Sequence, residues 1–194
     1  MMKRKIAIFA SGSGTNFEAL VRACERGEVN GEVVLMVCDK AGAKVIERAQ
    51  NRGVPTFVFC AKDYPDKASF EREICGRLES AGAELVCLAG YMRIVGETLL
   101  GRYGGRILNI HPALLPSFKG AHAIDDAFAF GVKVFGVTVH LIDNTIDGGT
   151  IVAQSAFEYY GNDRDEVERR IHEVEHKLYP WALEEFIKGL PENV

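Results

Sequence analysis

The sequence predicts an α/β protein built on a Rossmann-like open, mostly parallel sheet. Short apolar runs alternate with helix-like stretches through the first half of the chain, and a glycine-rich loop directly follows the first run. Such alternation is typical of parallel strands with helices on both faces of the sheet. Later apolar runs are separated by short turns, which indicates an antiparallel addition toward the C-terminus.

Seven segments rich in apolar and β-branched residues are expected to be strands. Most are bounded by glycine, proline or polar clusters, which end strands. These segments are residues 5–10, 33–38, 56–60, 85–89, 106–110, 134–142 and 151–157.

Five segments carry apolar residues at three- and four-residue spacing and are expected to be helices. Four are of ordinary length, and the fifth is long, charged and opened by Asp163. They are residues 16–26, 44–52, 67–81, 123–130 and 163–188.

Length and composition predict one domain, residues 1–194. The chain has 194 residues, of which 47% are hydrophobic, and no linker-like segment divides it. The net charge is −4 and the basic residues are dispersed, so neither a nucleic-acid stripe nor a membrane-binding face is expected. Small molecules are the expected partners.

Cysteine usage and the N-terminus favour a cytoplasmic location. The five cysteines are odd in number and form no Cys-x-x-Cys pair, so we expect reduced thiols rather than a disulfide framework or a zinc ribbon. The basic start, Met1 to Lys5, is followed by an apolar run too short for export or membrane spanning.

The segment Asn109-Ile110-His111-Pro112 carries the strongest chemical signal. Side chains two apart in a strand share a face, so Asn109 and His111 are expected to point the same way. An amide N–H can stabilise an oxyanion while an imidazole moves a proton, which suits acyl-type transfer. Capping of backbone groups at a strand end is the alternative role for both residues.

A second histidine and an acidic loop follow downstream. The strand-like run Gly136-Val137-Thr138-Val139 ends at His140, and the loop of residues 143–149 contains Asp147 and closes on two glycines. A strand-end histidine beside a carboxylate can form an acid–base unit, although a structural hydrogen bond is at least as good an interpretation of His140, and of His122.

The loop Ala10-Ser11-Gly12-Ser13-Gly14-Thr15-Asn16 leads into the first helix. Backbone N–H groups at such a helix start can hold a phosphate. Phe17 replaces the third glycine of a dinucleotide fingerprint, and no lysine follows Gly14 as a Walker A loop requires. A monophosphate site or a simple tight turn remain the two interpretations. In an open sheet this loop and residues 89–95 and 109–116 would meet at one crevice.

The segment His172-Glu173-Val174-Glu175-His176 matches the zinc-protease pattern of two histidines one helical turn apart. Zinc catalysis needs a third ligand, and Tyr179-Pro180-Trp181 follows where one would be expected. Paired His and Glu are also ordinary on a polar helix face.

Five motifs in order resemble the phosphoribosylglycinamide formyltransferase family. They are Gly12-Ser13-Gly14-Thr15-Asn16, Leu88-Ala89-Gly90-Tyr91-Met92-Arg93-Ile94, Asn109-Ile110-His111-Pro112-Ala113-Leu114-Leu115-Pro116, Gly136-Val137-Thr138-Val139-His140 and Asp147-Gly148-Gly149. The resemblance covers nearly the whole chain. Related methionyl-tRNA formyltransferases and formyltetrahydrofolate deformylases carry an extra domain, which makes the single-domain transferase the best match.

The resemblance implies the formyltransferase fold, with 10-formyltetrahydrofolate as co-substrate, no metal, and transfer of its formyl group to the amine of glycinamide ribonucleotide in purine synthesis. By the same resemblance, Asn109 would donate to the formyl oxygen, His111 would act as the acid–base group, and Asp147 would stabilise the charged imidazole. A monomer or weak homodimer is expected.

The resemblance also assigns binding residues. Gly14, Thr15 and Asn16 would bind the ribonucleotide phosphate, and Glu175 would reach the ribose. The folate would contact Asn109 and a loop next to the catalytic strand, with Lys67 near its tail; the loop residues are Met92, Arg93, Ile94 and Val95. The loop at Lys119-Gly120 departs from the Pro-Gly usual in the family.

Three alternatives remain open: a deformylase-like hydrolase, a zinc peptidase using His172, Glu173 and His176, and a noncatalytic phosphometabolite-binding module using only the glycine loop.

Overall fold

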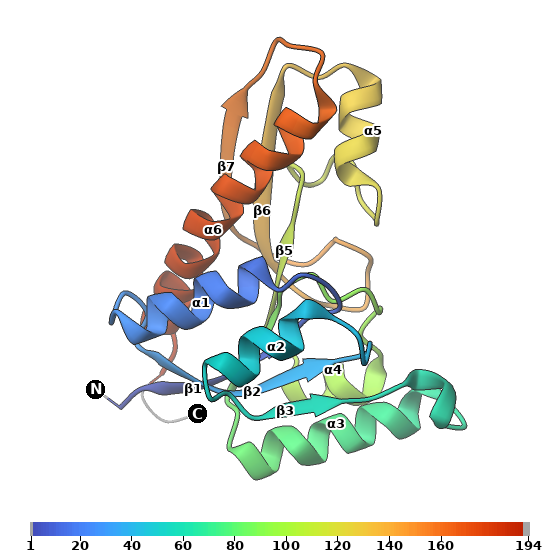
Figure 1. Ribbon diagram of the computed structural model, residues 1–194, viewed down its shortest axis with the longest axis vertical. Helices are drawn as coiled ribbons and strands as arrows, with labels where there is room; N and C mark the ends of the chain where they lie inside the picture. The colour runs from blue at the N-terminus through green and yellow to red at the C-terminus, as the bar shows by residue number, and fades with distance from the viewer. Residues whose placement is uncertain (1, 192–194) are drawn as a thin grey trace.

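The computed structural model describes residues 2–191 and contains one seven-stranded sheet in the order β3-β2-β1-β4-β5-β6-β7 (Figure 1). The first five strands pair in parallel, and β6 and β7 are antiparallel to their neighbours. This confirms the expected mostly parallel sheet and its antiparallel addition. The strands are β1 (Arg4–Phe9), β2 (Gly31–Cys38), β3 (Thr56–Val58), β4 (Leu85–Leu88), β5 (Ile107–His111), β6 (Val134–Leu141) and β7 (Ile151–Glu158).

Helices cover both faces of the sheet, as predicted. Alternate side chains of β1 enter two separate cores: Ile6 and Ile8 pack with α1, α2 and α6, whereas Ala7 and Phe9 pack with α3 and α4. Figure 1 shows α1 and α2 on one side of β1–β3 and α3 on the other. The helices are α1 (Thr15–Glu25), α2 (Lys44–Asn51), α3 (Lys67–Ala81), α4 (Glu97–Tyr103), α5 (Ala123–Phe130) and α6 (Arg164–Lys188), with a 3₁₀ turn η1 (Ala61–Asp63).

Helix α4 was not expected from the sequence. This helix has only seven residues, and its N-cap, Gly96, offers no side-chain cap. The buried carboxylate of Glu71 on α3 instead accepts the Gly96 N–H at 2.6 Å and the Leu99 N–H at 3.3 Å. A distant residue therefore supplies the cap that the local sequence lacks.

The long helix α6 is attached to the centre of the sheet. Its start is capped by Asp163, whose carboxylate accepts from the amides of Asp165 and Glu166. Further along, the buried hydroxyl of Tyr179 lies 3.0 Å from the carbonyl oxygens of both Leu88 and Leu108. These contacts fix the residues one turn earlier on α6, including Glu175, relative to the ends of β4 and β5.

Within residues 2–191, no helix is both long and apolar enough to cross a membrane.

Candidate active site

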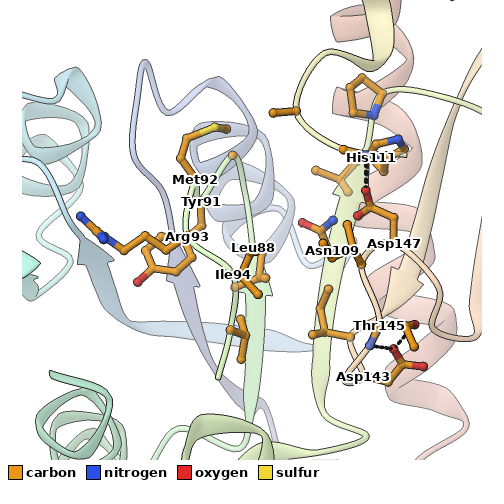
Figure 2. A pocket seen from close by; sticks show the side chains of 18 residues that line it. Leu88, Tyr91, Met92, Arg93, Ile94, Asn109, His111, Asp143, Thr145 and Asp147 are labelled. Atoms are coloured by element: carbon orange, nitrogen blue, oxygen red, sulfur yellow. Dashed lines mark hydrogen bonds and ion pairs between the residues drawn. The ribbon is translucent and has the colours of Figure 1, made fainter. Parts of the chain in front are cut away.

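A cavity of about 260 Å³ opens at the carboxyl ends of β4 and β5 (Figure 2). This is where a ligand site is expected in an open α/β sheet. The loop after β6 forms the opposite wall. The lining residues are Leu88, residues 90–95, residues 109–112, Gly120, Ala121, Ile142, Asp143 and residues 145–147.

His111 ends β5 at the wall of this cavity and is almost completely buried. Its Nε2 lies 2.8 Å from the carbonyl oxygen of Phe118, and because a carbonyl only accepts, Nε2 carries the proton. The other ring nitrogen, Nδ1, lies 3.6 Å from Oδ2 of Asp147. Nδ1 is therefore the nitrogen that can gain or lose a proton, and it faces a carboxylate.

Both contacts of His111 come from residues in an unusual backbone conformation. Phe118 and Asp147 are the two residues other than glycine with positive φ in the described chain, at 52° and 47°. Such a conformation is costly for a residue with a Cβ and is concentrated at functional sites. The Gly120 N–H donates to Asp147 Oδ2 at 2.7 Å, so the Lys119-Gly120 loop holds Asp147 in place.

Asn109 lies on the same strand face as His111, as the two-residue spacing predicted (Figure 2). Its amide nitrogen is 3.1 Å from Nε2 of His140 on the antiparallel strand β6. His140 is fully buried, and burial lowers its pKa and favours the neutral ring. His140 Nε2 also lies 3.7 Å from Oδ1 of Asp147, so this strand-end histidine stands beside a carboxylate. His122 is exposed and makes no side-chain cap at the start of α5.

The arrangement of these three side chains suits acyl transfer. Asn109 can present an amide N–H to an oxygen that becomes negative, and His111 can take or give a proton at Nδ1. Asp147 can stabilise the charged ring. The geometry brings the three predicted catalytic residues together on one cavity.

The predicted folate loop also lines this cavity. Residues 92–95 follow β4 in an irregular stretch, and the amides of Arg93, Ile94 and Val95 make no hydrogen bond within the described part of the chain. Met92 and Ile94 are exposed, whereas Val95 is buried. These free amides are available to a ligand.

Two predicted folate residues are placed differently. The Arg93 side chain turns away from Asn109 and Asp147 (Figure 2), and its Nε donates to Asp39 Oδ2 at 2.8 Å. Lys67 is exposed at the start of α3 and does not line the cavity; its stem lies beside Gly96, just after the loop.

The glycine-rich loop precedes α1 at the end of β1, which lies next to β4 in the sheet. Gly14 has φ 75°, and a Cβ there would lie 2.7 Å from Cβ of Val45. Only glycine adopts this positive φ readily and has no Cβ that would clash with Val45. Arg48 Nε donates to the Ser13 carbonyl oxygen at 2.8 Å, and with Thr15 and His176 it lines a second, open hollow of about 390 Å³.

Asn16 and Glu175 meet although they are far apart in sequence. Asn16 Nδ2 donates to Glu175 Oε2 at 2.9 Å, and both side chains are buried. His172 Nδ1 lies 2.9 Å from the same oxygen, and this hydrogen bond raises the pKa of His172. Asn16 Oδ1 is buried without a hydrogen-bond partner in the described chain. A buried unpaired acceptor beside a carboxylate suits a ligand that donates hydroxyls.

The zinc-protease pattern has a different role in the fold. Glu175, between its two histidines, binds Asn16 and His172 as described above. Among residues 2–191, no group of three or more His, Cys, Asp and Glu side chains is arranged to hold a metal ion. The third ligand that the sequence lacked is not supplied by the tertiary structure in this part of the chain.

Asp39 was not expected at the site, and Ser11 was expected there only as part of the glycine-rich loop. Both are buried at strand ends, and Ser11 Oγ donates to Asp39 Oδ1 at 2.5 Å. Their signal resembles that of Asn109, because each is a polar residue directly after an apolar run at the carboxyl edge of the sheet.

The chain is similar in sequence and in fold to proteins of known activity. The family model described as formyl transferase matches residues 4–183. A phosphoribosylglycinamide formyltransferase of Bacillus subtilis is 49% identical over 185 residues, which is 95% of each chain. The crystal structure of phosphoribosylglycinamide formyltransferase from Bacillus halodurans superposes with a TM-score of 0.94 at 44% identity, covering 98% of both chains. That of glycinamide ribonucleotide transformylase 1 from Geobacillus kaustophilus has a TM-score of 0.92 at 50% identity, covering 94% of this chain and 98% of the other.

Proposed function

Because the chain belongs to the formyl transferase family, we propose that its cavity transfers the formyl group of 10-formyltetrahydrofolate to the amine of glycinamide ribonucleotide, with Asn109, His111 and Asp147 as catalytic residues. The products are formylglycinamide ribonucleotide and tetrahydrofolate, and the reaction belongs to purine synthesis.

One observation carries the assignment of roles. The titratable nitrogen of His111, Nδ1, faces Asp147 at 3.6 Å, while Asn109 lies on the same face of β5. An acid–base group and an oxyanion donor thus border one cavity, and acyl transfer needs both.

The chemistry follows from this placement. The substrate amine attacks the formyl carbon, and the carbonyl electron pair moves onto oxygen, where the Asn109 N–H stabilises it. One proton must leave the resulting ammonium group, and one must reach the folate nitrogen N10 as its bond to the formyl carbon breaks. His111 Nδ1 can carry that proton, and Asp147 stabilises the imidazolium formed in between.

The ribonucleotide is assigned to the neighbouring loop. Gly14, Thr15 and Asn16 would bind its phosphate through the start of α1, where backbone N–H groups and the helix dipole favour an anion. Glu175 would accept hydrogen bonds from the ribose hydroxyls. The unpaired, buried Oδ1 of Asn16 beside Glu175 supports a hydroxyl-bearing ligand there.

The folate is assigned to the first cavity. Its pterin would pair with free backbone groups of Arg93, Ile94 and Val95 between the exposed apolar side chains of Met92 and Ile94, with Asn109 beside the formyl group. Lys67, at the outer end of the loop, would meet the acidic tail.

The proposal extends to the organisation of the protein. Residues 1–194 form a single formyltransferase domain, which the one continuous sheet and the match over residues 4–183 support. The protein acts as a monomer or weak homodimer, since one chain supplies all the proposed site residues. A cytoplasmic location is supported by the five free cysteines.

The test is a spectrophotometric assay of 10-formyltetrahydrofolate consumption, with and without glycinamide ribonucleotide and in the presence of a chelator. Wild type should turn over only with the acceptor, and His111→Ala should lose this activity. Consumption without acceptor would instead indicate a deformylase. Loss of activity in the presence of the chelator would instead indicate a metal-dependent reaction.

A further inference from the structure

A buried hydrogen-bond network links the ends of three parallel strands next to the proposed folate cavity. Asp39 follows β2 and has a side chain only 3% exposed. One of its oxygens accepts from Ser11 Oγ after β1 at 2.5 Å, and the other accepts from Arg93 Nε after β4 at 2.8 Å. No catalytic role assigned above uses Asp39 or Ser11.

The direction of each hydrogen bond is determined by chemistry. The carboxylate of Asp39 only accepts, so the single hydroxyl proton of Ser11 must point at it. The Ser11 oxygen then accepts the N–H of Met92 at 2.9 Å, and the Ser11 N–H donates to the Gly90 carbonyl oxygen at 3.0 Å. Ser11 thus holds the loop at two points, Gly90 and Met92.

These bonds decide which backbone N–H groups of the loop are already paired. The Met92 N–H is used by Ser11, whereas the next three amides, those of Arg93, Ile94 and Val95, make no hydrogen bond within residues 2–191. The Arg93 side chain is drawn away from the cavity toward Asp39 (Figure 2). Without Asp39, the Arg93 guanidinium would be released at the cavity rim, the loop would lose its link to the end of β2, and the Ser11 hydroxyl that holds Met92 would lose the acceptor that orients it.

We propose that Asp39 is a positioning residue that sets the conformation of the 90–95 loop for folate, by holding Ser11 and Arg93 at the same time. The inference rests on the proposed function, because it assumes that this loop binds the folate. Preorganisation of the loop lowers the ordering cost of binding, so its loss weakens folate binding rather than the chemical step.

The experiment measures kcat and the KM of each substrate for wild type, Asp39→Asn and Arg93→Leu. Asp39→Asn keeps the shape but replaces one accepting oxygen with an NH2 group, so that either Ser11 Oγ or Arg93 Nε loses its acceptor. Arg93→Leu changes a side chain that is 37% exposed, so it leaves the buried residues intact if Asp39→Asn folds poorly. We expect each variant to raise the KM for 10-formyltetrahydrofolate about tenfold, with kcat and the ribonucleotide KM changed less than about threefold.

Two further variants serve as a conservative replacement and as a control. Arg93→Lys keeps a positive charge opposite Asp39, so its KM for 10-formyltetrahydrofolate should lie between those of wild type and Arg93→Leu. Glu79→Gln breaks an exposed ion pair with Arg102 on the same side of the sheet and should leave both KM values unchanged.

Selective loss of folate affinity in the Asp39 and Arg93 variants supports the inference. An unchanged folate KM in a folded variant overturns it, as does an equal rise in both KM values. Absence of formyl transfer by the wild type overturns the proposed function and this inference with it, so the two failures are distinguishable.

Discussion

The side-chain amide of Asn109 lies 3.1 Å from Nε2 of His140, on the neighbouring antiparallel strand. His140 Nδ1 lies 3.0 Å from the carbonyl oxygen of Leu141 and must donate to it, so in the neutral ring Nε2 is an acceptor. One N–H of Asn109 therefore points to His140, and the second is left for the cavity. A residue outside the cavity wall thus orients the proposed oxyanion donor.

His140→Leu should lower kcat about tenfold, because a hydrogen bond worth about 1 to 1.5 kcal/mol that orients Asn109 is lost. Steady-state kinetics check this, with the exposed His122→Gln as control. An unchanged kcat in folded His140→Leu would show that Asn109 needs no orienting partner.

Asn109→Ala should lower kcat by about a hundredfold or more, since removal of one oxyanion donor typically costs about 2.7–4 kcal/mol of transition-state stabilisation. Asn109→Asp, which keeps the size but brings a negative charge to the same place, should lose at least as much. Near-native turnover of either variant, with normal folding and substrate binding, would contradict the role.

Asp147→Asn should lower kcat about a hundredfold while leaving the melting temperature close to that of wild type. Asparagine tolerates the left-handed φ of 47° and can still accept the Gly120 N–H, so the change removes the negative charge that faces His111 Nδ1 at 3.6 Å and His140 Nε2 at 3.7 Å. Asp147→Ala, measured in parallel, loses the hydrogen bond as well and should also be less stable. Full activity of Asp147→Asn would mean that the charge is not required.

The two histidines of α6 should have opposite effects on the pH dependence of stability. The hydrogen bond to Glu175 raises the pKa of His172 above its usual 6.5, whereas burial lowers the pKa of His176. The stabilising contribution of His172 to the free energy of unfolding is therefore fully present below about pH 6.5, and it is lost as pH rises through the raised pKa. His176 instead destabilises the fold as pH falls below about 6.5.

Thermal unfolding between pH 5 and 9 tests this pair. His172→Gln should be less stable than wild type at acid pH, by less than about 1 kcal/mol since the side chain is 46% exposed, and equal to it at alkaline pH. His176→Gln should gain stability relative to wild type at acid pH. If stability changed with pH in the same way in both variants and wild type, the opposite pKa shifts of His172 and His176 would be refuted.

The regular elements with strong periodicity were predictable. The helices at residues 67–81 and 123–130 have the predicted bounds, and the seven strands lie where the apolar runs indicated, within a few residues at their ends. These elements could be predicted because their apolar side chains recur at the period that buries one face. Helix α4 could not, since Glu71 caps it from another helix.

Part of the candidate site was also readable in the sequence. Asn109 and His111 share a face because they are two residues apart in one strand, a relation that needs no tertiary information. The glycines of the first loop, including Gly14, likewise indicated a tight turn into α1. Motif order further indicated the family and the candidate catalytic residues.

Only the tertiary structure decided how those residues are oriented. The proton on Nε2 of His111 is set by the Phe118 carbonyl, the amide of Asn109 by His140, and the turn of Arg93 away from the cavity by Asp39. Each partner is brought in by another strand or loop, and hydrogen-bond direction depends on where a partner atom lies, which no local pattern of residues encodes. The sequence by itself therefore determined the fold class and the chemical groups at the edge of the sheet. Packing of distant segments determined the direction in which each group points.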